Sequence, residues 1–342
     1  MTTHAYTTDG KVTHFSKKED INTKLANIIG PKFSAYREQW ELANKLELVT
    51  DFPLFLQVDM NQTCNYKCPH CIVGTPELIK DYYGPEEIDF DGFKKIVDEG
   101  AEHGCPSISP QGSNEPLLIK NLHEWISYAH KRGFIDIMMN TNASGLTERR
   151  SQELLDSGIT RLRFSLDAFT QETYAKVRVG SQPLDNVVAN IERFLELKEK
   201  GGYKLPVTGV SLCRLADNEH EVEAFQNYWQ DKVDMVSIQT FVPPVDVGDY
   251  SRFYPKQQFE NIGMDDFKCP QPFQRVVIRN HDITPCCVVF SSKLKIGDLR
   301  TQTIYEAWHN EYMQELREIH RLGQYEKNEM CKKCVGLIYP QN

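Results

Sequence analysis

Three cysteines lie within eight residues, Cys64, Cys68 and Cys71, and their spacing is Cys-x3-Cys-x2-Cys. Each iron of an ordinary cubane iron–sulfur cluster takes one cysteine, so three close cysteines leave one iron open to bind another molecule. Zinc usually takes paired Cys-x2-Cys units and closes to four ligands, and disulfide bonds are typical of secreted chains. The spacing therefore favours an iron–sulfur cluster with an open iron over a zinc site or disulfide bonds.

This run of cysteines resembles the motif of the radical S-adenosylmethionine (SAM) superfamily. The resemblance implies that Cys64, Cys68 and Cys71 ligate a [4Fe–4S] cluster whose open iron chelates the amino and carboxylate groups of SAM. Electron transfer from such a cluster breaks a carbon–sulfur bond of SAM and yields a 5′-deoxyadenosyl radical. The resemblance also implies an electron donor such as flavodoxin or ferredoxin.

A second motif begins at Gly112 and continues through Ser113, Asn114, Glu115 and Pro116. Radical SAM enzymes commonly carry Gly-Gly-Glu-Pro at this place, where the glycines and the acidic side chain hold the amino group of SAM. The chain keeps Glu115 and Pro116 but has Ser113 and Asn114 where the glycine pair would lie. Backbone carbonyls can still accept the ammonium protons, so we expect residues 112–115 to bind SAM. The alternative is a turn that leads into a helix.

Polar residues also stand at or just beyond the ends of two further predicted strands. Asn142 follows the third strand, and Ser165 and Asp167 belong to a Ser-Leu-Asp sequence that resembles a SAM-contacting strand of the family. Side chains alternate along a strand, so Ser165 and Asp167 are expected to project to the same side. Arg178, downstream, is expected to form a bidentate pair with the carboxylate of SAM.

The C-terminal part holds five cysteines within 66 residues: Cys269, Cys286, Cys287, Cys331 and Cys334. Their arrangement resembles the SPASM/twitch extension of radical SAM proteins, which carries additional iron–sulfur clusters. The resemblance implies one auxiliary [4Fe–4S] cluster on Cys269, Cys286, Cys331 and Cys334. Cys287 is the alternative to Cys286, because neighbouring side chains point apart on an extended chain. A structural zinc ion at the same four cysteines is the other interpretation.

Two thiols outside these ligand sets could donate a hydrogen atom to a substrate radical. Cys213 lies near the end of a predicted strand, and whichever of Cys286 and Cys287 does not ligate is the second candidate. A lone cysteine on a strand is more often a small buried apolar residue, which is the other interpretation of Cys213.

The elements that must position these residues alternate between strands and helices. Strands are predicted over 54–60, 106–110, 134–139, 161–166, 205–212 and 233–239. Helices are predicted over 91–103, 119–131, 148–157, 171–177, 185–200 and 219–230. Such alternation indicates parallel β/α units, in an open sheet or a barrel. The family resemblance implies an α/β fold with a partial (β/α)6 barrel, whose chemistry lies at the carboxyl ends of the strands.

Three regions follow from this pattern. Residues 1–49 are expected to be a polar segment, irregular to about residue 30, followed by a helix over 33–48. Residues 50–242 are expected to form the partial barrel. Residues 243–342 are expected to form a linker and a small SPASM/twitch-like domain that contains a helix over 304–321.

Composition limits the partners. The net charge is −9, whereas nucleic acids and anionic membranes select a basic surface, so neither is an expected partner. No apolar run approaches the roughly 20 residues that span a bilayer, and residues 1–22 lack the apolar core of a signal peptide. We therefore expect a cytoplasmic protein whose cysteines serve as metal ligands rather than as disulfides.

These features predict a radical SAM oxidoreductase or epimerase that acts on a sugar, cyclitol or similar small polar metabolite. The single auxiliary cluster is similar to that of 2-deoxy-scyllo-inosamine dehydrogenases. A peptide maturase is the first alternative, although many of these carry a longer N-terminal peptide-binding domain than residues 1–49. A non-catalytic iron–sulfur or zinc protein is the second, and its only support is the altered pair Ser113 and Asn114.

Overall fold

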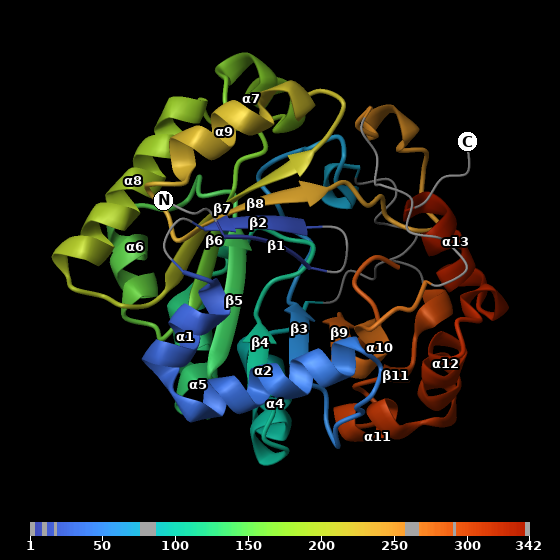
Figure 1. Ribbon diagram of the computed structural model, residues 1–342. Helices are drawn as coiled ribbons and strands as arrows, with labels where there is room; N and C mark the ends of the chain where they lie inside the picture. The colour runs from blue at the N-terminus through green and yellow to red at the C-terminus, as the bar shows by residue number, and fades with distance from the viewer. Residues whose placement is uncertain are drawn as a thin grey trace.

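The structure is a computed structural model that describes residues 4–8, 12–16, 19–75, 87–256, 267–289 and 292–338. Its strands form one mixed sheet in the order β1-β2-β8-β7-β6-β5-β4-β3-β9-β10-β11 (Figure 1). The strands span His4–Thr8 (β1), Val12–Ser16 (β2), Phe55–Asp59 (β3), Ser107–Ser109 (β4), Asp136–Thr141 (β5), Arg161–Ser165 (β6), Val207–Arg214 (β7), Met235–Thr240 (β8), Arg275–Arg279 (β9), Asp282–Thr284 (β10) and Gly297–Asp298 (β11).

The six central strands, β3 to β8, are parallel and lie side by side in chain order. The helices between them span Phe90–Glu102 (α4), Leu122–Lys131 (α5), Glu148–Leu155 (α6), Gln171–Val177 (α7), Leu184–Lys200 (α8) and Val222–Trp229 (α9). This is the predicted succession of β/α units, and it confirms the α/β fold with a partial (β/α)6 barrel. Apolar side chains are buried along these strands, and β4 and β6 alternate them with serine or arginine.

Close packing between helix and sheet is visible where α4 crosses β3. Gly100 on α4 is buried, and a Cβ atom there would lie only 2.8 Å from Phe134 and 3.0 Å from Leu56. The bare backbone of Gly100 therefore allows α4 to approach the strand directly ahead of the cysteine run.

The N-terminal region differs from the expectation of an irregular segment. Strands β1 and β2 form a hairpin, and β2 pairs antiparallel with β8, which extends the sheet at that edge. A helix then spans Ile21–Ile29 (α1), and the Asp20 side chain caps it by accepting hydrogen bonds from the N–H groups of Asn22 and Thr23. The helix expected over 33–48 is the second one, and it spans Pro31–Asn44 (α2). Pro31 occupies its first position, where no helical hydrogen bond needs the missing N–H.

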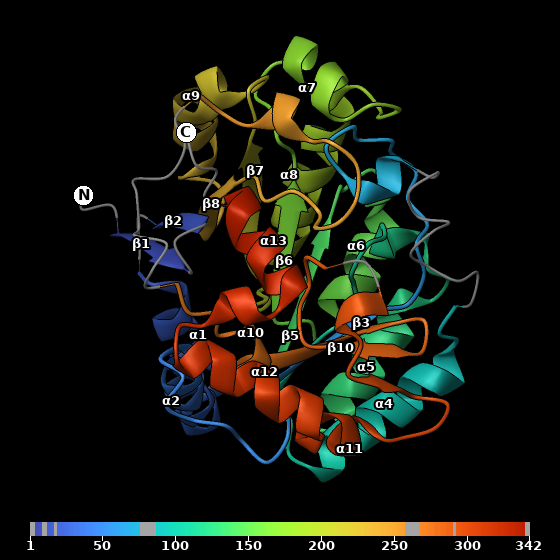
Figure 2. The ribbon, with the colours of Figure 1, turned by 90° about the vertical axis from the view of Figure 1, so that its right-hand side faces the viewer.

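The C-terminal region continues the same sheet from the opposite edge. Strand β9 lies parallel to β3, and β10 and β11 follow it in antiparallel pairs. The helices here span Gln271–Gln274 (α10), Ile304–His309 (α11), Glu311–Arg321 (α12) and Glu329–Ile338 (α13). Helices α11 to α13 gather on the β9 side of the molecule, opposite α6, α8 and α9 (Figure 1). Figure 2 faces this side, with α11, α12 and α13 in front.

The single helix predicted over 304–321 is divided in two. Asn310 adopts an extended conformation after α11, and its side-chain oxygen caps α12 by accepting a hydrogen bond from the N–H of Met313 at 2.8 Å. Asparagine is among the preferred helix N-cap residues, which explains the break inside an otherwise continuous apolar pattern. Among the described residues, no helix is long and apolar enough to cross a membrane.

Trp308 on α11 attaches the C-terminal helices to the rest of the molecule. Its side chain is fully buried, its indole N–H donates to the carbonyl of Thr50 at 2.8 Å, and the guanidinium of Arg317 lies 4.1 Å from its ring. Thr50 lies shortly before β3 in the chain, so this hydrogen bond joins α11 to the segment that leads into the first strand of the barrel.

We predict that Trp308→Ala lowers the free energy of unfolding of the metal-free protein by about 3–5 kcal/mol, the usual cost of deleting a buried tryptophan. Trp308→Phe retains much of the packing and is expected to lose clearly less. Urea unfolding followed by circular dichroism measures both. Equal losses for the two variants would show that Trp308 contributes little by packing.

Candidate active site

A cavity of about 440 Å³ opens at the carboxyl ends of the parallel strands. The predicted site residues that line it are Cys64, Cys68, Cys71, Gly112, Ser113, Asn114, Glu115, Asn142, Ser165, Arg178, Cys213 and Cys287. These residues come from seven separate segments, which the fold brings together at the ends of the strands. Asp167 is the predicted residue of the barrel that does not line the cavity, and it lies directly behind the wall.

The cysteine loop is tightly folded on itself. The N–H of Cys71 donates to the carbonyl of Cys68 at 3.0 Å, and the N–H of Gly74 donates to the carbonyl of Cys71 at 2.9 Å. A Cβ atom at Gly74 would lie 2.1 Å from the carbonyl oxygen of Cys68, so only glycine fits there. The loop therefore places its three thiols by backbone contacts before any ligand binds.

The loop is also fastened to the end of β5. The side-chain amide of Asn142 donates to the side-chain oxygen of Asn65 at 2.9 Å, and Asn65 donates in turn to the hydroxyl of Ser144 at 2.9 Å. Both polar ends of Asn142 are engaged, because its oxygen accepts from Ser144. Asn142, predicted as a SAM contact, thus positions the loop that carries Cys64.

The three thiols fit an iron–sulfur cluster chemically. Burial raises the pKa of Cys64, Cys68 and Cys71, the last to about 11, so a bound cation is needed to hold them as thiolates at neutral pH. Across the described residues, no group of three or more His, Cys, Asp or Glu is arranged to hold a single metal ion. The cysteines instead stand around a cavity, and a cluster with a different iron for each thiolate suits that arrangement.

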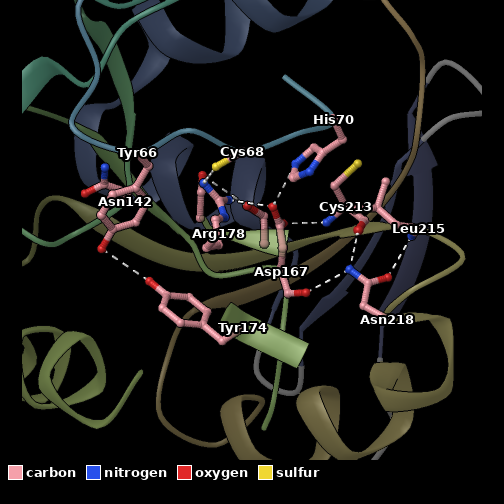
Figure 3. A network of polar contacts seen from close by, with 12 residues as sticks. Tyr66, Cys68, His70, Asn142, Asp167, Tyr174, Arg178, Cys213, Leu215 and Asn218 are labelled. Carbon is pink, nitrogen blue, oxygen red and sulfur yellow. Dashed lines mark hydrogen bonds and ion pairs between the residues drawn. The ribbon is translucent and has the colours of Figure 1, made fainter. Parts of the chain in front are cut away.

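Asp167 is the centre of a buried polar network behind this loop (Figure 3). One of its carboxylate oxygens lies 2.6 Å from the Arg178 guanidinium and 3.5 Å from Nε2 of His70. The other accepts a hydrogen bond from the backbone N–H of Cys213 at 2.7 Å. Burial by itself would raise the pKa of Asp167, but Arg178 and His70 outweigh it and lower the pKa. The network joins the cysteine loop to β6 and β7.

This arrangement differs from the expectation that Ser165 and Asp167 project to the same side. Strand β6 ends at Ser165, and Asp167 has a φ of 61°, so the alternation of side chains no longer applies. Ser165 faces the cavity, whereas Asp167 points behind its wall. Arg178 was expected to bind the carboxylate of SAM, but its guanidinium pairs with Asp167 and lies 3.9 Å from the Cys68 sulfur.

Asp59, the last residue of β3, holds the loop over residues 112–115. Asp59 was not among the predicted site residues. Asp59 accepts a hydrogen bond from the N–H of Ser113 at 2.8 Å, and a Cβ atom at Gly112 would lie 2.5 Å from its carboxyl carbon. The side-chain oxygen of Asn114 accepts from the N–H of Gly112 at 3.1 Å and closes the turn. Asn114 thus stabilises the turn at a position where the family commonly has glycine.

Glu115 is almost completely buried at the edge of the cavity. Its carboxylate accepts hydrogen bonds from the N–H groups of Leu117 and Asn142 and from the hydroxyl of Thr141. Burial raises the pKa of Glu115 against the effect of these donors. The carboxylate therefore fixes the end of β5 next to the loop that was expected to hold the amino group of SAM.

The cavity lining combines polar and apolar groups. Asn140 donates to the side-chain oxygen of Gln111 at 3.2 Å and accepts from Nε of Arg163 at 2.8 Å. Gln239 and Thr240 at the end of β8 add two more polar side chains, and the apolar residues that follow them, 241–244, also line the cavity. A few polar groups in a partly apolar lining suit a small polar molecule held in one orientation.

A second, smaller cavity of about 50 Å³ lies among the C-terminal cysteines. Five cysteines line it: Cys269, Cys286, Cys287, Cys331 and Cys334. The pKa of the Cys331 thiol is raised by burial and by the charges of three of the others, namely Cys269, Cys286 and Cys334. The same four cysteines were expected to hold the auxiliary cluster. Cys287 also lines the large cavity, so the backbone at Cys286 and Cys287 separates the two cavities.

A buried ion pair connects the two cavities. Nε of Arg279 on β9 lies 3.6 Å from the Asp59 carboxylate, and the other guanidinium nitrogens donate to the carbonyls of Cys287 at 2.7 Å and Val289 at 3.0 Å. Burial raises the pKa of Asp59 to about 6, and the Arg279 charge opposes that rise. Arg279 thus holds the loop of Cys287 at a fixed place relative to the loop of Ser113.

The two remaining cysteines have different surroundings. Cys105 lies in the core before β4, its thiol contacts the carbonyl of Ser107 at 3.5 Å, and burial raises its pKa to about 12. Cys213 lines the large cavity, and burial raises the pKa of its thiol well above the ordinary value. Cys213 therefore keeps its hydrogen at neutral pH. All ten cysteines fall within the described residues, and none forms a disulfide bond.

Comparison with known proteins identifies the class to which this fold and site belong. The model of the radical SAM superfamily matches residues 58–228, and the model of the iron–sulfur cluster-binding SPASM domain matches residues 269–335. The chain belongs to the radical SAM superfamily and carries a C-terminal SPASM domain. It is therefore a radical SAM enzyme whose cofactors are SAM, a [4Fe–4S] cluster and auxiliary iron–sulfur clusters.

Curated relatives are GTP 3′,8-cyclases. That of Campylobacter fetus is 28% identical over 167 residues, which are 48% of this chain and 49% of the relative. A probable GTP 3′,8-cyclase of Methanococcus maripaludis is 32% identical over 141 residues, which are 41% of this chain and 45% of the relative. The chain thus spans about half the length of the curated relatives it matches.

Solved structures share the fold over most of the chain. BtrN in complex with AdoMet and 2-DOIA has a TM-score of 0.53 and 20% identity, and the match covers 85% of this chain and 97% of BtrN. AnSMEcpe with bound AdoMet has a TM-score of 0.59 and 15% identity, over 85% of this chain and 92% of the other. SuiB of Streptococcus suis bound to the precursor peptide SuiA has a TM-score of 0.52 and 13% identity, over 83% and 71%.

We predict that Asp167→Asn destabilises the metal-free protein by about 3 kcal/mol, because it leaves the Arg178 guanidinium buried without its carboxylate. Urea unfolding at pH 7.5 measures the change. The matched control is Glu172→Gln, which removes an exposed ion pair with Lys176 on α7 and is expected to leave the unfolding midpoint unchanged. The network would be energetically unimportant if the two variants unfolded at the same urea concentration.

Proposed function

We propose that this radical SAM enzyme abstracts a hydrogen atom from an unactivated C–H bond of a small, neutral, hydroxyl-bearing metabolite such as a sugar or cyclitol, and dehydrogenates it. One observation carries the proposal: the large cavity is lined both by the cysteine loop 64–71 and by Cys287, which also lines the cavity of the second cysteine set. A substrate in this cavity would lie close to both the expected radical source and the expected electron acceptor.

The cavity lining supports a neutral substrate rather than GTP. Among the described residues, the lining contains a single lysine or arginine, Arg178, and its charge is paired with Asp167. A triphosphate is best bound by several cationic groups. The remaining polar lining consists mainly of amides and hydroxyls, such as Gln111, Asn140 and Thr240, which form hydrogen bonds with alcohol groups.

When bound, SAM and its cluster supply the hydrogen-abstracting radical, and an auxiliary cluster supplies an acceptor for the electron that oxidation leaves behind. The residues of the chain prepare the place for that chemistry. Asp167, Asn142 and Asp59 fix the loops around the cavity, so a bound substrate meets an already ordered wall. The apolar lining residues Phe241, Val242, Pro243 and Pro244 would reduce the amount of water in the cavity, which protects a radical from side reactions.

Epimerisation is the second candidate, and Cys213 favours it. The thiol lines the cavity and remains protonated, and the backbone N–H of Cys213 is held by Asp167 at 2.7 Å. A protonated thiol in that place could return a hydrogen atom to the opposite face of a substrate radical. Oxidation and epimerisation both begin with hydrogen abstraction. They differ in whether the substrate radical then loses an electron or gains a hydrogen atom.

The partners follow from the same chemistry. We propose a small-molecule substrate, a flavodoxin or ferredoxin as electron donor, and a cytoplasmic location, in which the ten cysteines stay reduced.

The first test uses the enzyme reconstituted anaerobically with iron, sulfide, SAM and dithionite. It is offered neutral sugars and cyclitols, GTP, and short peptides, and the formation of 5′-deoxyadenosine above the substrate-free rate is measured. We expect stimulation by a member of the neutral hydroxylated class. Stimulation by GTP or by a peptide alone would contradict the proposal.

The second test separates the two outcomes by running the reaction in D2O. Dehydrogenation predicts a carbonyl product. This reaction forms no new C–H bond, so the reaction itself introduces no deuterium from the solvent. Epimerisation through Cys213 predicts one deuterium per inverted carbon, and Cys213→Ala would then abolish inversion while 5′-deoxyadenosine still forms. Cys105→Ala, in the core and away from the cavity, serves as the matched cysteine control.

A further inference from the structure

His320 on α12 is a buried histidine that belongs to none of the cysteine motifs. Its side chain is 1% exposed, and it lines the small cavity together with Cys269, Cys286, Cys331 and Cys334. Apart from Gln271, the rest of the lining consists of thiols and apolar groups, and a polar side chain is costly to bury there unless it forms a hydrogen bond.

One atom of the ring has such a partner. Nε2 of His320 lies 3.4 Å from the sulfur of Cys331. Nδ1 is buried and has no hydrogen-bond partner among the described residues. A buried N–H without an acceptor is rarer in proteins than a buried acceptor without a donor. The tautomer that fits this environment therefore carries its hydrogen on Nε2, pointed at the sulfur.

A cation on the same helix is engaged elsewhere. The cation one turn earlier on the helix, Arg317, donates to the carbonyl of Pro272 at 2.9 Å and lies over the Trp308 ring. A hydrogen-bond donor is thus placed beside the sulfur of Cys331, one of the cysteines that line this cavity.

We propose that His320 donates its Nε2 hydrogen to the sulfur of Cys331 and thereby raises the reduction potential of the auxiliary cluster. Hydrogen bonds to the cysteine sulfurs stabilise the additional negative charge of the reduced cluster, and they are one of the means by which proteins set such potentials. His320 is in this sense a positioning and tuning residue, which acts through Cys331. The inference rests on the presence of an auxiliary cluster but not on the identity of the substrate.

The test is a redox titration of the reconstituted full-length enzyme, with the auxiliary cluster followed by electron paramagnetic resonance. Added SAM shifts the signal of the other cluster and so separates the two. We expect His320→Leu to retain both clusters and to lower the ratio of reduced to oxidised auxiliary cluster threefold to tenfold at a fixed potential. Tenfold corresponds to about 59 mV for one electron. His320→Gln keeps an N–H donor and is expected to recover part of this loss.

The matched control is Leu316→Val, since Leu316 lines the same cavity from the same helix but carries no donor. It is expected to leave the ratio unchanged. Pulsed resonance spectra in H2O and D2O should show an exchangeable proton coupled to the auxiliary cluster in the parent and not in His320→Leu. An unchanged potential in His320→Leu would overturn the proposal. Loss of about four irons together with a strong nitrogen coupling in the parent would also overturn it, because His320 would then be a ligand.

None of these measurements requires a substrate. A potential that shifts as expected in an enzyme that proves not to be a dehydrogenase would leave the role of His320 intact. A dehydrogenase whose potential does not respond to His320→Leu would leave the proposed function intact.

Discussion

Parallel pairing of β3 with β9 brings the cysteine loop 64–71 and the C-terminal Cys287 to the same cavity. The register places Asp59 opposite Arg279, at the carboxyl end of the strand that leads into the cysteine loop. Because β9 begins six residues after Cys269 and is followed by β10, Cys286 and Cys287, this pairing sets the second cysteine set beside the cavity. The pairing therefore fixes the separation between the two sets at the edge of the cavity.

Two buried ion pairs fix the loops around the cavity next to the paired strands β3 and β9. Asp59 with Arg279 and Asp167 with Arg178 are all largely buried, and burying charges is unfavourable unless additional hydrogen bonds compensate. The compensation is present, because the carboxylates also accept backbone N–H groups from Ser113 and Cys213, and Arg279 donates to two backbone carbonyls. These pairs hold the loops in a defined geometry, and a reactive radical requires that geometry.

Much of the fold and the cofactors could be predicted from the sequence. The Cys64–Cys71 spacing and the alternation of apolar strands with amphipathic helices are local patterns, and the structure confirms the barrel they indicate. The β1–β2 hairpin was missed because its strands are short, polar and stabilised by the edge of β8. The break at Asn310 was missed because the apolar periodicity continues through it. Asp167 was placed on the wrong side because its positive φ ends the alternation of β6.

Three residues near the two cysteine sets could not be predicted from the sequence for a different reason. Asp59, Arg279 and His320 are far apart in the chain, and each acquires its role from a partner that only the tertiary structure supplies. A charged residue at the end of an apolar strand was the available signal for Asp59 and Arg279. His320 had no comparable signal, since a histidine near the end of an amphipathic helix is ordinary.

We propose that two separate cysteine sets hold two clusters beside one cavity, with Cys286 as the expected ligand of the second set and Cys287 as the alternative. Iron and sulfide analysis after anaerobic reconstitution tests it most directly, in the parent, in a variant with Cys64, Cys68 and Cys71 changed to alanine, and in Cys286→Ala and Cys287→Ala. The account predicts about eight irons in the parent, about four in the triple variant and in Cys286→Ala, and about eight in Cys287→Ala. Four irons and one zinc in the parent, or loss of iron in Cys287→Ala but not in Cys286→Ala, would contradict it.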